Sequence, residues 1–424
     1  MKTLALSLVM GCSLLLVAGA AADPLPRAKA EDVGFSSEKL NRIGQTLRAD
    51  VERGRIPGAI VVVARKGRIA YYETVGFRDK SSGAPMPLDA IFRIASMTKP
   101  LVSVATMMLY EEGRLFLSDP VSKYIPQLAD RQVGVEKLDP ATGKSVFYTV
   151  PAESEMTIQD LLRHTSGFTY GNRGTTHVHK LFEGGTSGLA RELTPQEFID
   201  RLAKLPLLNQ PGTTWEYGVS TDVLGRVVEV VAGKPLGQVL AERIFRPLKM
   251  TDTGFVVTAD KQARLAQGLA TDPDTGKEIK LFDPTIPPKF ECGGGCGVST
   301  ASDYVRFTQM LLNRGTLEGT RILGRKTVEY MTSDHLGTRI APGPAYSPGP
   351  GYGFGLGFAV RKETGVASLT GSAGDYNWAG AFGTAFWVDP KEELTVVVMV
   401  QAPGPIRVHY RQLLKSLVLQ AITD

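Results

Sequence analysis

The sequence holds a serine and a lysine three residues apart, Ser96 and Lys99, at the start of an expected helix over residues 97–112. Residues at this spacing lie on one face of a helix, so the hydroxyl and the amine can meet. A serine hydroxyl becomes an effective nucleophile when a neighbouring base takes its proton. A lysine serves as that base only where burial or nearby positive charge keeps it neutral. The motif alone leaves open both nucleophilic catalysis and an ordinary helix start.

The same spacing occurs again in Ser36-Ser37-Glu38-Lys39. There, Ser36 or Ser37 precedes apolar residues at helical spacing, which is typical of an N-cap. The helix expected after Ser96 has a broader apolar stripe, formed by Leu101, Val102, Val104, Ala105, Met108 and Leu109. A helix this apolar is buried, and a buried hydroxyl and amine need polar partners. The surroundings of Ser96 therefore differ from those of a simple cap.

A second polar segment, residues 211–220, contains Tyr217 and precedes an expected helix over residues 221–232. A tyrosine on such a loop can carry a proton where nearby cations stabilise its phenolate. Aromatic packing under the loop is the alternative. We expect Asp222 to be an N-terminal helix residue, favoured by the helix dipole.

A third segment, residues 374–384, is rich in glycine and alanine and leads into an expected strand over residues 380–388. Small residues along a strand let another group approach its backbone closely. A strand edge beside a nucleophile can donate an N–H to a developing oxyanion. A tightly packed edge strand is the alternative.

The remaining pattern predicts the elements that would position these groups. Residues 59–66 and 69–75 are typical of two strands joined by a short hairpin at Gly67-Arg68. Further strands are expected at 353–361, 380–388 and 394–401, and helices at 157–163, 195–204, 221–232, 236–246, 301–313 and 406–422. Residues 133–150 and 337–352 are expected to be loops.

These elements predict an α/β fold of the α+β type. An antiparallel sheet would be built from both chain ends, about residues 30–95 and 298–424, and flanked by helices. A mainly helical region, about residues 96–297, would be inserted between them. We expect residues 23–424 to form a single domain.

Composition limits the class of protein. The chain has 424 residues, 21% of them charged, and its formal net charge of +5 is not gathered into a basic run, which excludes an electrostatic footprint for nucleic acid. Residues 1–22 combine one lysine, a mostly apolar stretch and Ala20-Ala21-Ala22, as a secretory signal peptide does. This segment is too short to anchor the mature protein, which we expect to be exported to the periplasm or the medium.

Two cysteines, Cys292 and Cys296, lie after the expected signal peptide and flank three glycines. An oxidising compartment permits a bridge between them, and the glycines allow a tight loop. Two unbridged thiols are the alternative. No histidine is adjacent in sequence to complete a metal site.

Taken in order, these segments resemble the serine β-lactamase-like superfamily. Its family VIII carboxylesterases, which are related to class C β-lactamases, give the nearest likeness. The resemblance covers roughly residues 30–420. The stretches that carry it, besides Tyr217 and the late Trp-x-Gly, are residues 92–99, 119–126, 157–167, 297–307 and 386–390.

The resemblance implies a role for each motif. Ser96 would be the acylated nucleophile, and Lys99 would activate it or hold the proton network. Tyr217 would act as base in acylation and as acid toward the leaving group. The backbone N–H groups of Ser96 and Ala381 would form the oxyanion hole. His164 is expected to be a structural hydrogen-bonding residue.

Two departures from the β-lactamase pattern bear on the substrate. Trp378-Ala379-Gly380 stands where β-lactamases carry Lys-Thr-Gly, so an apolar indole replaces the cation that meets a β-lactam carboxylate. Val219 replaces the asparagine of the Tyr-x-Asn motif. These four residues, Trp378, Ala379, Gly380 and Val219, are the expected substrate contacts, and both changes favour neutral, apolar acyl groups.

The resulting hypothesis is a secreted serine carboxylesterase that hydrolyses or transfers the acyl groups of small neutral esters. It requires no metal and no organic cofactor, and its partner is a small-molecule ester. A β-lactamase or a D-amino-acid peptidase on the same machinery is one alternative. A non-catalytic ligand- or wall-binding protein that retains the fold is another. The sequence does not define the oligomeric state.

Overall fold

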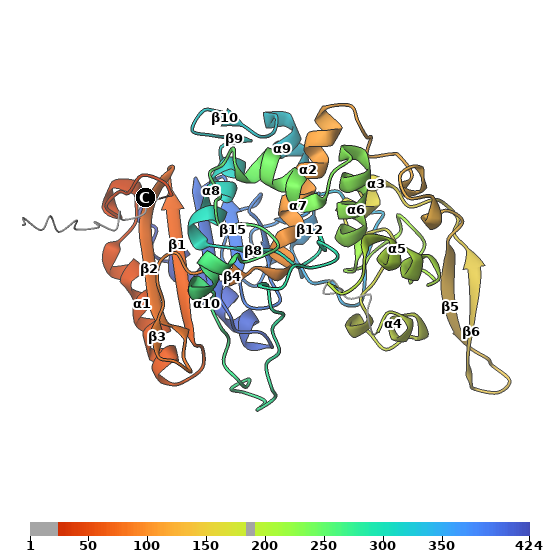
Figure 1. The fold of residues 1–424 in the computed structure, drawn as a ribbon, viewed down its shortest axis with the longest axis horizontal. Coiled ribbons are helices and arrows are strands. Elements are labelled where there is room, and N and C mark those ends of the chain that lie inside the picture. Colours follow the sequence, from red (N-terminus) through yellow and green to blue (C-terminus); the bar gives the residue numbers. More distant parts are fainter. Residues whose placement is uncertain (1–23, 184–190) are drawn as a thin grey trace, which may run out of the picture.

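The computed structural model describes residues 24–183 and 191–424, so the expected signal peptide, residues 1–22, lies outside the described residues. Its largest sheet contains β1 (Gly58–Arg65), β2 (Arg68–Asp79), β3 (Ala84–Pro85), β12 (Tyr352–Phe354), β13 (Ala359–Arg361), β14 (Tyr376–Ala379), β15 (Ala385–Asp389) and β16 (Leu394–Val400). The strand order is β12-β13-β14-β15-β16-β1-β2-β3, and every neighbouring pair is antiparallel. Strands from both ends of the chain meet where β1 pairs with β16 (Figure 1). The expected sheet is confirmed.

Helices surround this sheet and form most of the inserted region. They are α1 (Ser37–Glu52), α2 (Thr98–Glu111), α3 (Ile158–Leu162), α4 (His177–Leu181), α5 (Pro195–Ala203), α6 (Ser220–Ala232), α7 (Leu236–Leu240), α8 (Ala301–Leu312), α9 (Arg325–Met331) and α10 (Ile406–Leu419). A π-helical turn, Ala241–Phe245, continues α7. Smaller antiparallel pairs join β4 (Phe92–Arg93) to β8 (Val298–Ser299), β9 (Thr316–Leu317) to β10 (Thr320–Arg321) and β5 (Gln132–Leu138) to β6 (Ser145–Pro151), whereas β7 (Thr214–Trp215) pairs in parallel with β11 (Ala341–Pro342).

The sheet separates two apolar cores. All residues of β1 are buried, and successive side chains point to opposite faces of a strand. Val62 therefore enters the core that contains α2 and α8, and Val63 enters the core under α1 and α10. Figure 1 shows the helical region extending away from the sheet, with α2 between the two parts. Because α2 lies in the larger core, its first turn is inside the protein.

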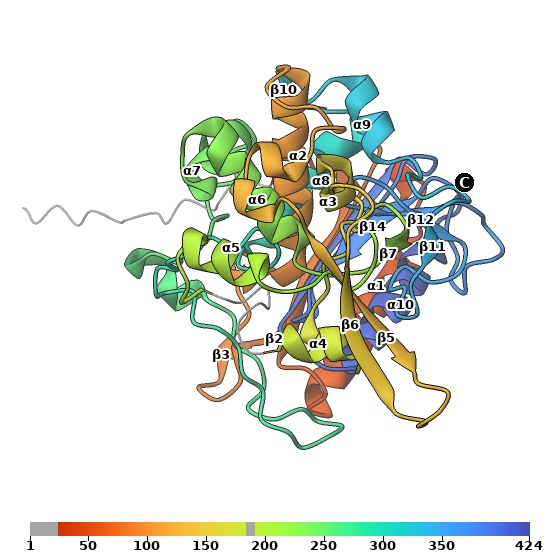
Figure 2. The ribbon, with the colours of Figure 1, turned by 90° about the vertical axis from the view of Figure 1, so that its right-hand side faces the viewer.

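One expected loop and one expected strand differ from the elements in the structure. Residues 133–150, expected to be a loop, form the β5–β6 hairpin, which projects from the helical region (Figures 1 and 2). Alternating apolar residues on either side of the Asp139–Gly143 turn make this hairpin possible. The single strand expected at 353–361 is two strands, because Gly357, with φ of 98°, reverses the chain between β12 and β13.

The strand expected at 380–388 also begins later than predicted. Gly380 and Gly383 lie in the turn between β14 and β15, and the Gly380 N–H donates to Thr384. The second Ser-x-x-Lys copy is a cap as expected, since the Ser36 side chain accepts the Lys39 N–H at the start of α1. Within residues 24–183 and 191–424, no helix combines the length and apolar character needed to cross a membrane.

Candidate active site

Ser96 lies in a single 3₁₀ turn, η2 (Ala95–Met97), directly before α2. Ala95 has a φ of 45°, a left-handed conformation that residues other than glycine rarely adopt, and it turns the chain sharply before the serine. The Thr98 hydroxyl donates to the Ala95 carbonyl at 2.7 Å and accepts the Gly297 N–H at 3.0 Å. These bonds fix the turn, so the backbone determines where the Ser96 hydroxyl lies.

Lys99 is buried under this turn, with only 1% of its surface exposed. Its Nζ lies 3.4 Å from Ser96 Oγ and 3.2 Å from the Tyr170 hydroxyl oxygen. The Gly294 carbonyl accepts a third hydrogen bond from it at 2.5 Å. Three oxygen atoms match the three donors of an ammonium group. The structure brings Ser96 and Lys99 together as expected, and it adds Tyr170 and Gly294, which the sequence analysis missed.

Tyr217 lies over the same amine. The centroid of its ring is 4.6 Å from Lys99 Nζ and 5.5 Å from the ring centroid of Tyr170. Ser96 and Tyr217 also line one cavity, so the hydroxyl, the amine and the phenol are gathered in one place. Burial and the charge of Asp222 raise the pKa of Tyr170 well above its usual value, so Tyr170 is held as the neutral phenol.

Asp222 lies in the first turn of α6, as expected, but its carboxylate is fully buried beside this cluster. Its Oδ1 accepts the Gly294 N–H at 2.9 Å. The carbonyl of the same glycine accepts from Lys99, so Gly294 links the carboxylate to the amine. Burial raises the pKa of Asp222 to about 6, although the positive charge of Lys99 opposes the change.

A disulfide between Cys292 and Cys296 closes the short loop that carries Gly294. The structure therefore selects the bridge from the two alternatives that the sequence left open. A Cβ at position 294 would lie 2.2 Å from Asp222 Oδ2, so only glycine fits there. The disulfide and the carboxylate together fix the carbonyl that receives the Lys99 hydrogen bond.

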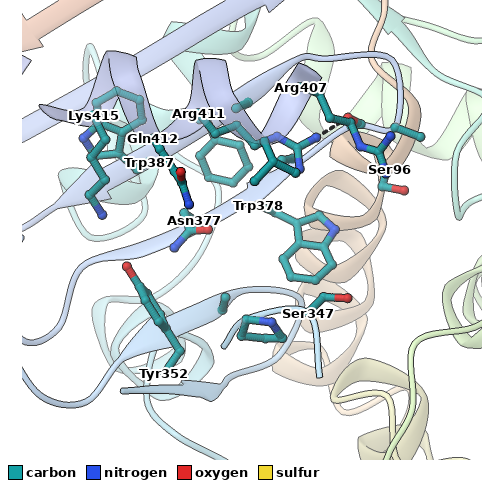
Figure 3. Close-up of a pocket in the computed structure, with 18 of the residues that line it drawn as sticks. Ser96, Ser347, Tyr352, Asn377, Trp378, Trp387, Arg407, Arg411, Gln412 and Lys415 are labelled. Atoms are coloured by element: carbon teal, nitrogen blue, oxygen red, sulfur yellow. Dashed lines mark hydrogen bonds between the residues drawn. The ribbon is translucent and has the colours of Figure 1, made fainter. Parts of the chain in front are cut away.

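A cavity of about 360 Å³ opens beside Ser96 (Figure 3). Residues 378–381, at the end of β14 and in the turn after it, line the cavity. A Cβ at Gly380 would lie 2.3 Å from the Ile94 carbonyl oxygen, so glycine permits this turn to approach the segment before Ser96. Ala381 follows this glycine and lines the same cavity as Ser96, and the oxyanion hole formed by their N–H groups stays a prediction.

Trp378 forms the apolar part of the cavity wall. It is 8% exposed, and its ring centroid lies 5.3 Å from those of Tyr217 and Phe354. The indole N–H is buried and has no hydrogen-bond partner among the described residues. The indole thus contributes an apolar ring to the cavity wall.

Basic side chains form another wall of the cavity, contributed by Arg173, Arg407, Arg411 and Lys415. None of the described residues that line the cavity is acidic. The three cations of α10 are four residues apart and so share one face of the helix. Figure 3 shows them in succession along α10, with Arg407 and Arg411 toward Ser96. This wall was not predicted: the spacing of the three cations indicates one helix face, but nothing near them in sequence indicates that this face meets the cavity.

Known proteins resemble this chain over most of its length. The family model described as Beta-lactamase matches residues 43–418. The chain belongs to the β-lactamase family. Protein Rv1367c of Mycobacterium tuberculosis is 36% identical over 84% of this chain and 88% of its own length. Esterase EstB of Burkholderia gladioli is 30% identical over 91% of this chain and 97% of its own length.

A solved structure agrees with this assignment to the β-lactamase family. EstCE1, described as a hydrolase with promiscuous acyltransferase activity, superposes with a TM-score of 0.73 at 27% identity. The superposition covers 91% of this chain and 99% of EstCE1. The resemblance noted from the sequence is confirmed, and the chain is a serine hydrolase of the β-lactamase family.

Two other residues named from the β-lactamase-family resemblance are buried, and of these only Val219 was expected to contact the substrate. Val219 is fully buried in the apolar core and is not among the described residues that line the cavity, because it precedes α6 on its inner side. His164 contacts the Tyr217 ring, with centroids 4.8 Å apart, and its carbonyl accepts the Glu216 N–H at 2.8 Å. Burial and the charge of Lys99 lower the pKa of His164, so it is neutral and supports Tyr217 by packing.

Because Asp222 is buried in this β-lactamase-family site, we expect its ionisation to make kcat/KM depend on pH. We expect Asp222→Asn to lower kcat/KM about 10- to 100-fold at pH 8, because it removes a charge that holds Lys99 in place. In the wild type, kcat/KM should rise with pH through about 6 as Asp222 ionises, and the variant should lose this limb. The free energy of unfolding should change with pH in the opposite direction to kcat/KM. The native carboxyl keeps its proton above its ordinary pKa of 3.8, so the free energy of unfolding falls as the pH rises from about 4 to about 6.

Asp303→Asn is the matched control. Asp303 lies in the first turn of α8, and burial raises its pKa to about 6 as well. Its carboxylate, however, accepts hydrogen bonds from the Thr253 hydroxyl and the Asp252 backbone N–H. It should alter the pH dependence of unfolding without moving the activity limb. Equal activity profiles for Asp222→Asn and the wild type would exclude a role for Asp222 at Lys99.

Proposed function

We propose that the protein is an exported serine carboxylesterase that takes the acyl group of small neutral esters onto Ser96. The observation that carries this proposal is the contact between Lys99 Nζ and Ser96 Oγ, at 3.4 Å, beside a cavity that Tyr217 and Trp378 line. Export rests on the signal-peptide pattern of residues 1–22.

The acylation step follows from these positions. Ser96 Oγ attacks the ester carbonyl while its proton passes to Tyr217, which enters this step as the phenolate. Lys99, in contact with Ser96 Oγ and 4.6 Å from the centroid of the Tyr217 ring, stabilises the negative charge. The N–H groups of Ser96 and Ala381 receive the oxyanion of the tetrahedral intermediate. Tyr217 then returns the proton to the departing alkoxide as the carbon–oxygen bond to it breaks.

Deacylation repeats these steps with a second nucleophile. Water, or an alcohol, gives its proton to Tyr217 and attacks the acyl carbonyl, and Ser96 leaves with that proton. The reaction as written uses no metal and no organic cofactor. The printed descriptions of EstB, an esterase, and EstCE1, a hydrolase with promiscuous acyltransferase activity, support hydrolysis with acyl transfer as a second outcome.

The alternative activity within the family is hydrolysis of an amide bond, as in a β-lactamase or a D-amino-acid peptidase. The Trp378 indole stands at the wall where the resemblance places a cation, and an alkoxide leaves more readily than an amine. We therefore expect kcat/KM for a chromogenic butyrate ester to exceed that for a chromogenic cephalosporin by about 100-fold or more. Faster turnover of the cephalosporin would overturn the ester assignment.

The rival of another class is a protein that binds ligands without catalysis. A fluorophosphonate probe distinguishes such a binding protein from a serine hydrolase, since the probe reacts covalently only with an activated serine. We expect stoichiometric labelling that peptide mapping places on Ser96. A chain that stays unlabelled and turns over none of the esters would be a binding protein.

A further inference from the structure

The two N–H groups of the predicted oxyanion hole come from segments far apart in the chain. Ser96 lies in η2, which follows β4 of a two-stranded pair. Ala381 lies in the turn between β14 and β15 of the largest sheet. An oxyanion is stabilised only where both donors lie within hydrogen-bond distance of it. The spacing of these two segments therefore decides whether the hole can bind an oxyanion.

The Thr384 side chain joins the two segments. It is fully buried, and its hydroxyl donates to the Ile94 carbonyl at 3.1 Å. Ile94 directly precedes η2, and Thr384 directly precedes β15. No other hydrogen bond joins residues 380–384 to residues 92–99, and the structure describes every residue of both segments. One hydroxyl thus provides the polar contact between the turn after β14 and the segment that carries the serine.

The backbones of the two segments approach closely at this hydrogen bond. A Cβ at Gly380 would lie 2.3 Å from both the Ile94 carbonyl oxygen and Thr384 Oγ1. The Gly380 N–H donates to the Thr384 carbonyl at 2.8 Å, so Thr384 binds the turn through its backbone and Ile94 through its side chain. Ala381 follows Gly380, so the position of its N–H depends on this contact.

The Ile94 carbonyl also belongs to the turn that holds the serine. It accepts the Met97 N–H at 3.0 Å, the hydrogen bond that closes η2 around Ser96. The same oxygen therefore receives one donor from the serine turn and one from Thr384. Loss of the Thr384 hydroxyl leaves this carbonyl with the Met97 donor, so no buried acceptor loses its last partner. A substitution that removes only this hydroxyl therefore tests the link between the segments.

We propose that Thr384 is a positioning residue that keeps the N–H groups of Ser96 and Ala381 at the spacing an oxyanion requires. This inference rests on the proposed esterase function and deepens it. Thr384 is not among the described residues that line the cavity, so it acts through the two backbone segments and not by touching the substrate. Its contribution therefore arises as charge develops on the carbonyl oxygen, in the transition state rather than in the bound ester.

Thr384→Val replaces the hydroxyl by a methyl group. We expect kcat per active site to fall about 10- to 100-fold and KM to change less than about twofold, because a displaced donor weakens binding of the oxyanion and not of the ester. Ki for an alkylboronic acid should rise by the factor by which kcat/KM falls, because its tetrahedral adduct with Ser96 places an oxygen in the hole. Thr384→Ser, which keeps the hydroxyl, should restore kcat to within about threefold of the wild type.

Thr308→Val is the matched control. Thr308 is fully buried, and its hydroxyl donates to the Val305 carbonyl at 3.1 Å within α8, not to either segment. A purely structural role of Thr384 would lower the midpoint of denaturation in both valine variants and kcat in neither. Thr384→Ala removes the same hydroxyl with a smaller side chain and gives the same comparison where valine does not fold. Unchanged kcat and Ki in these Thr384 variants, or losses that Thr384→Ser does not reverse, would overturn the positioning role.

The rate of labelling by a fluorophosphonate separates this inference from the proposed function. Attack of Ser96 Oγ on phosphorus releases fluoride while the phosphoryl oxygen occupies the same hole, so we expect Thr384→Val to be labelled at least about tenfold more slowly than the wild type. A wild type that is labelled but turns over no ester would exclude the proposed esterase function, and the ratio of labelling rates would then decide the role of Thr384. Equal rates would contradict that role whatever the substrate, and a wild type that is neither labelled nor active would overturn both proposals.

Discussion

Ser96→Ala is expected to reduce ester turnover to the uncatalysed background, with kcat lower by about 10⁴-fold or more. The alanine removes the atom that would become acylated, so no other residue of the cluster can replace it. The fold should persist, because the turn that holds position 96 depends on the Thr98 bonds to Ala95 and Gly297 and not on the serine hydroxyl. Steady-state hydrolysis of a butyrate ester measures the loss, and circular dichroism measures the fold.

The chain supplies a matched control in its second Ser-x-x-Lys segment. Ser36→Ala removes a hydroxyl that caps α1, so it should cost about 1 kcal/mol in the free energy of unfolding. It should leave kcat unchanged, because α1 lies under the opposite core from α2. Residual turnover of Ser96→Ala near the wild-type rate would rule out Ser96 as the nucleophile.

Lys99→Met is expected to lower kcat about 10³-fold, the size of effect that follows the loss of one group positioned to stabilise developing charge. Methionine fills a similar volume, so the core around α2 remains packed. The variant loses the contacts of Nζ with Ser96 Oγ and the Tyr170 hydroxyl, and it leaves the Gly294 carbonyl without its donor. Acylation should slow more than deacylation, because activation of the serine is lost.

Pre-steady-state kinetics distinguish these steps. The wild type should release a burst of chromogenic alcohol as the acyl-enzyme accumulates, and Lys99→Met should release it without a burst. Lys39→Met, at the equivalent place in the α1 copy, should behave as the wild type does. A Lys99→Met variant with an unchanged burst would show that the amine does not activate Ser96.

The local pattern predicted those parts of the molecule whose structure depends on nearby residues. The apolar stripe after Ser96 gave α2, and Gly67 gave the β1–β2 turn, where it adopts a φ of 72°. The hairpin at 133–150 was not predicted, because most of its side chains are exposed or partly exposed and its two strands pair with each other outside the main sheet. The strand expected at 380–388 began too early because Gly380 and Gly383 serve a turn and a close approach.

The site residues that were missed act through contacts between distant segments. Tyr170 and Gly294 matter because folding brings both to the amine of Lys99. Asp222 was predicted as a helix-start residue, and only burial beside that amine gives its carboxylate a further role. Arg411 lies on the last helix, and nothing near it in sequence indicates that α10 reaches the cavity. Such contacts follow from topology rather than from local spacing.

The proposed reaction requires that Ser96, in the 3₁₀ turn directly before α2, becomes covalently acylated during turnover. Mass spectrometry of the intact protein, quenched in acid milliseconds after mixing with a butyrate ester, tests it most directly. We predict a population heavier by one butyryl group, mapped to the peptide that contains Ser96 and absent from Ser96→Ala. Full turnover with no adduct, or with the adduct on a different residue, would contradict the account.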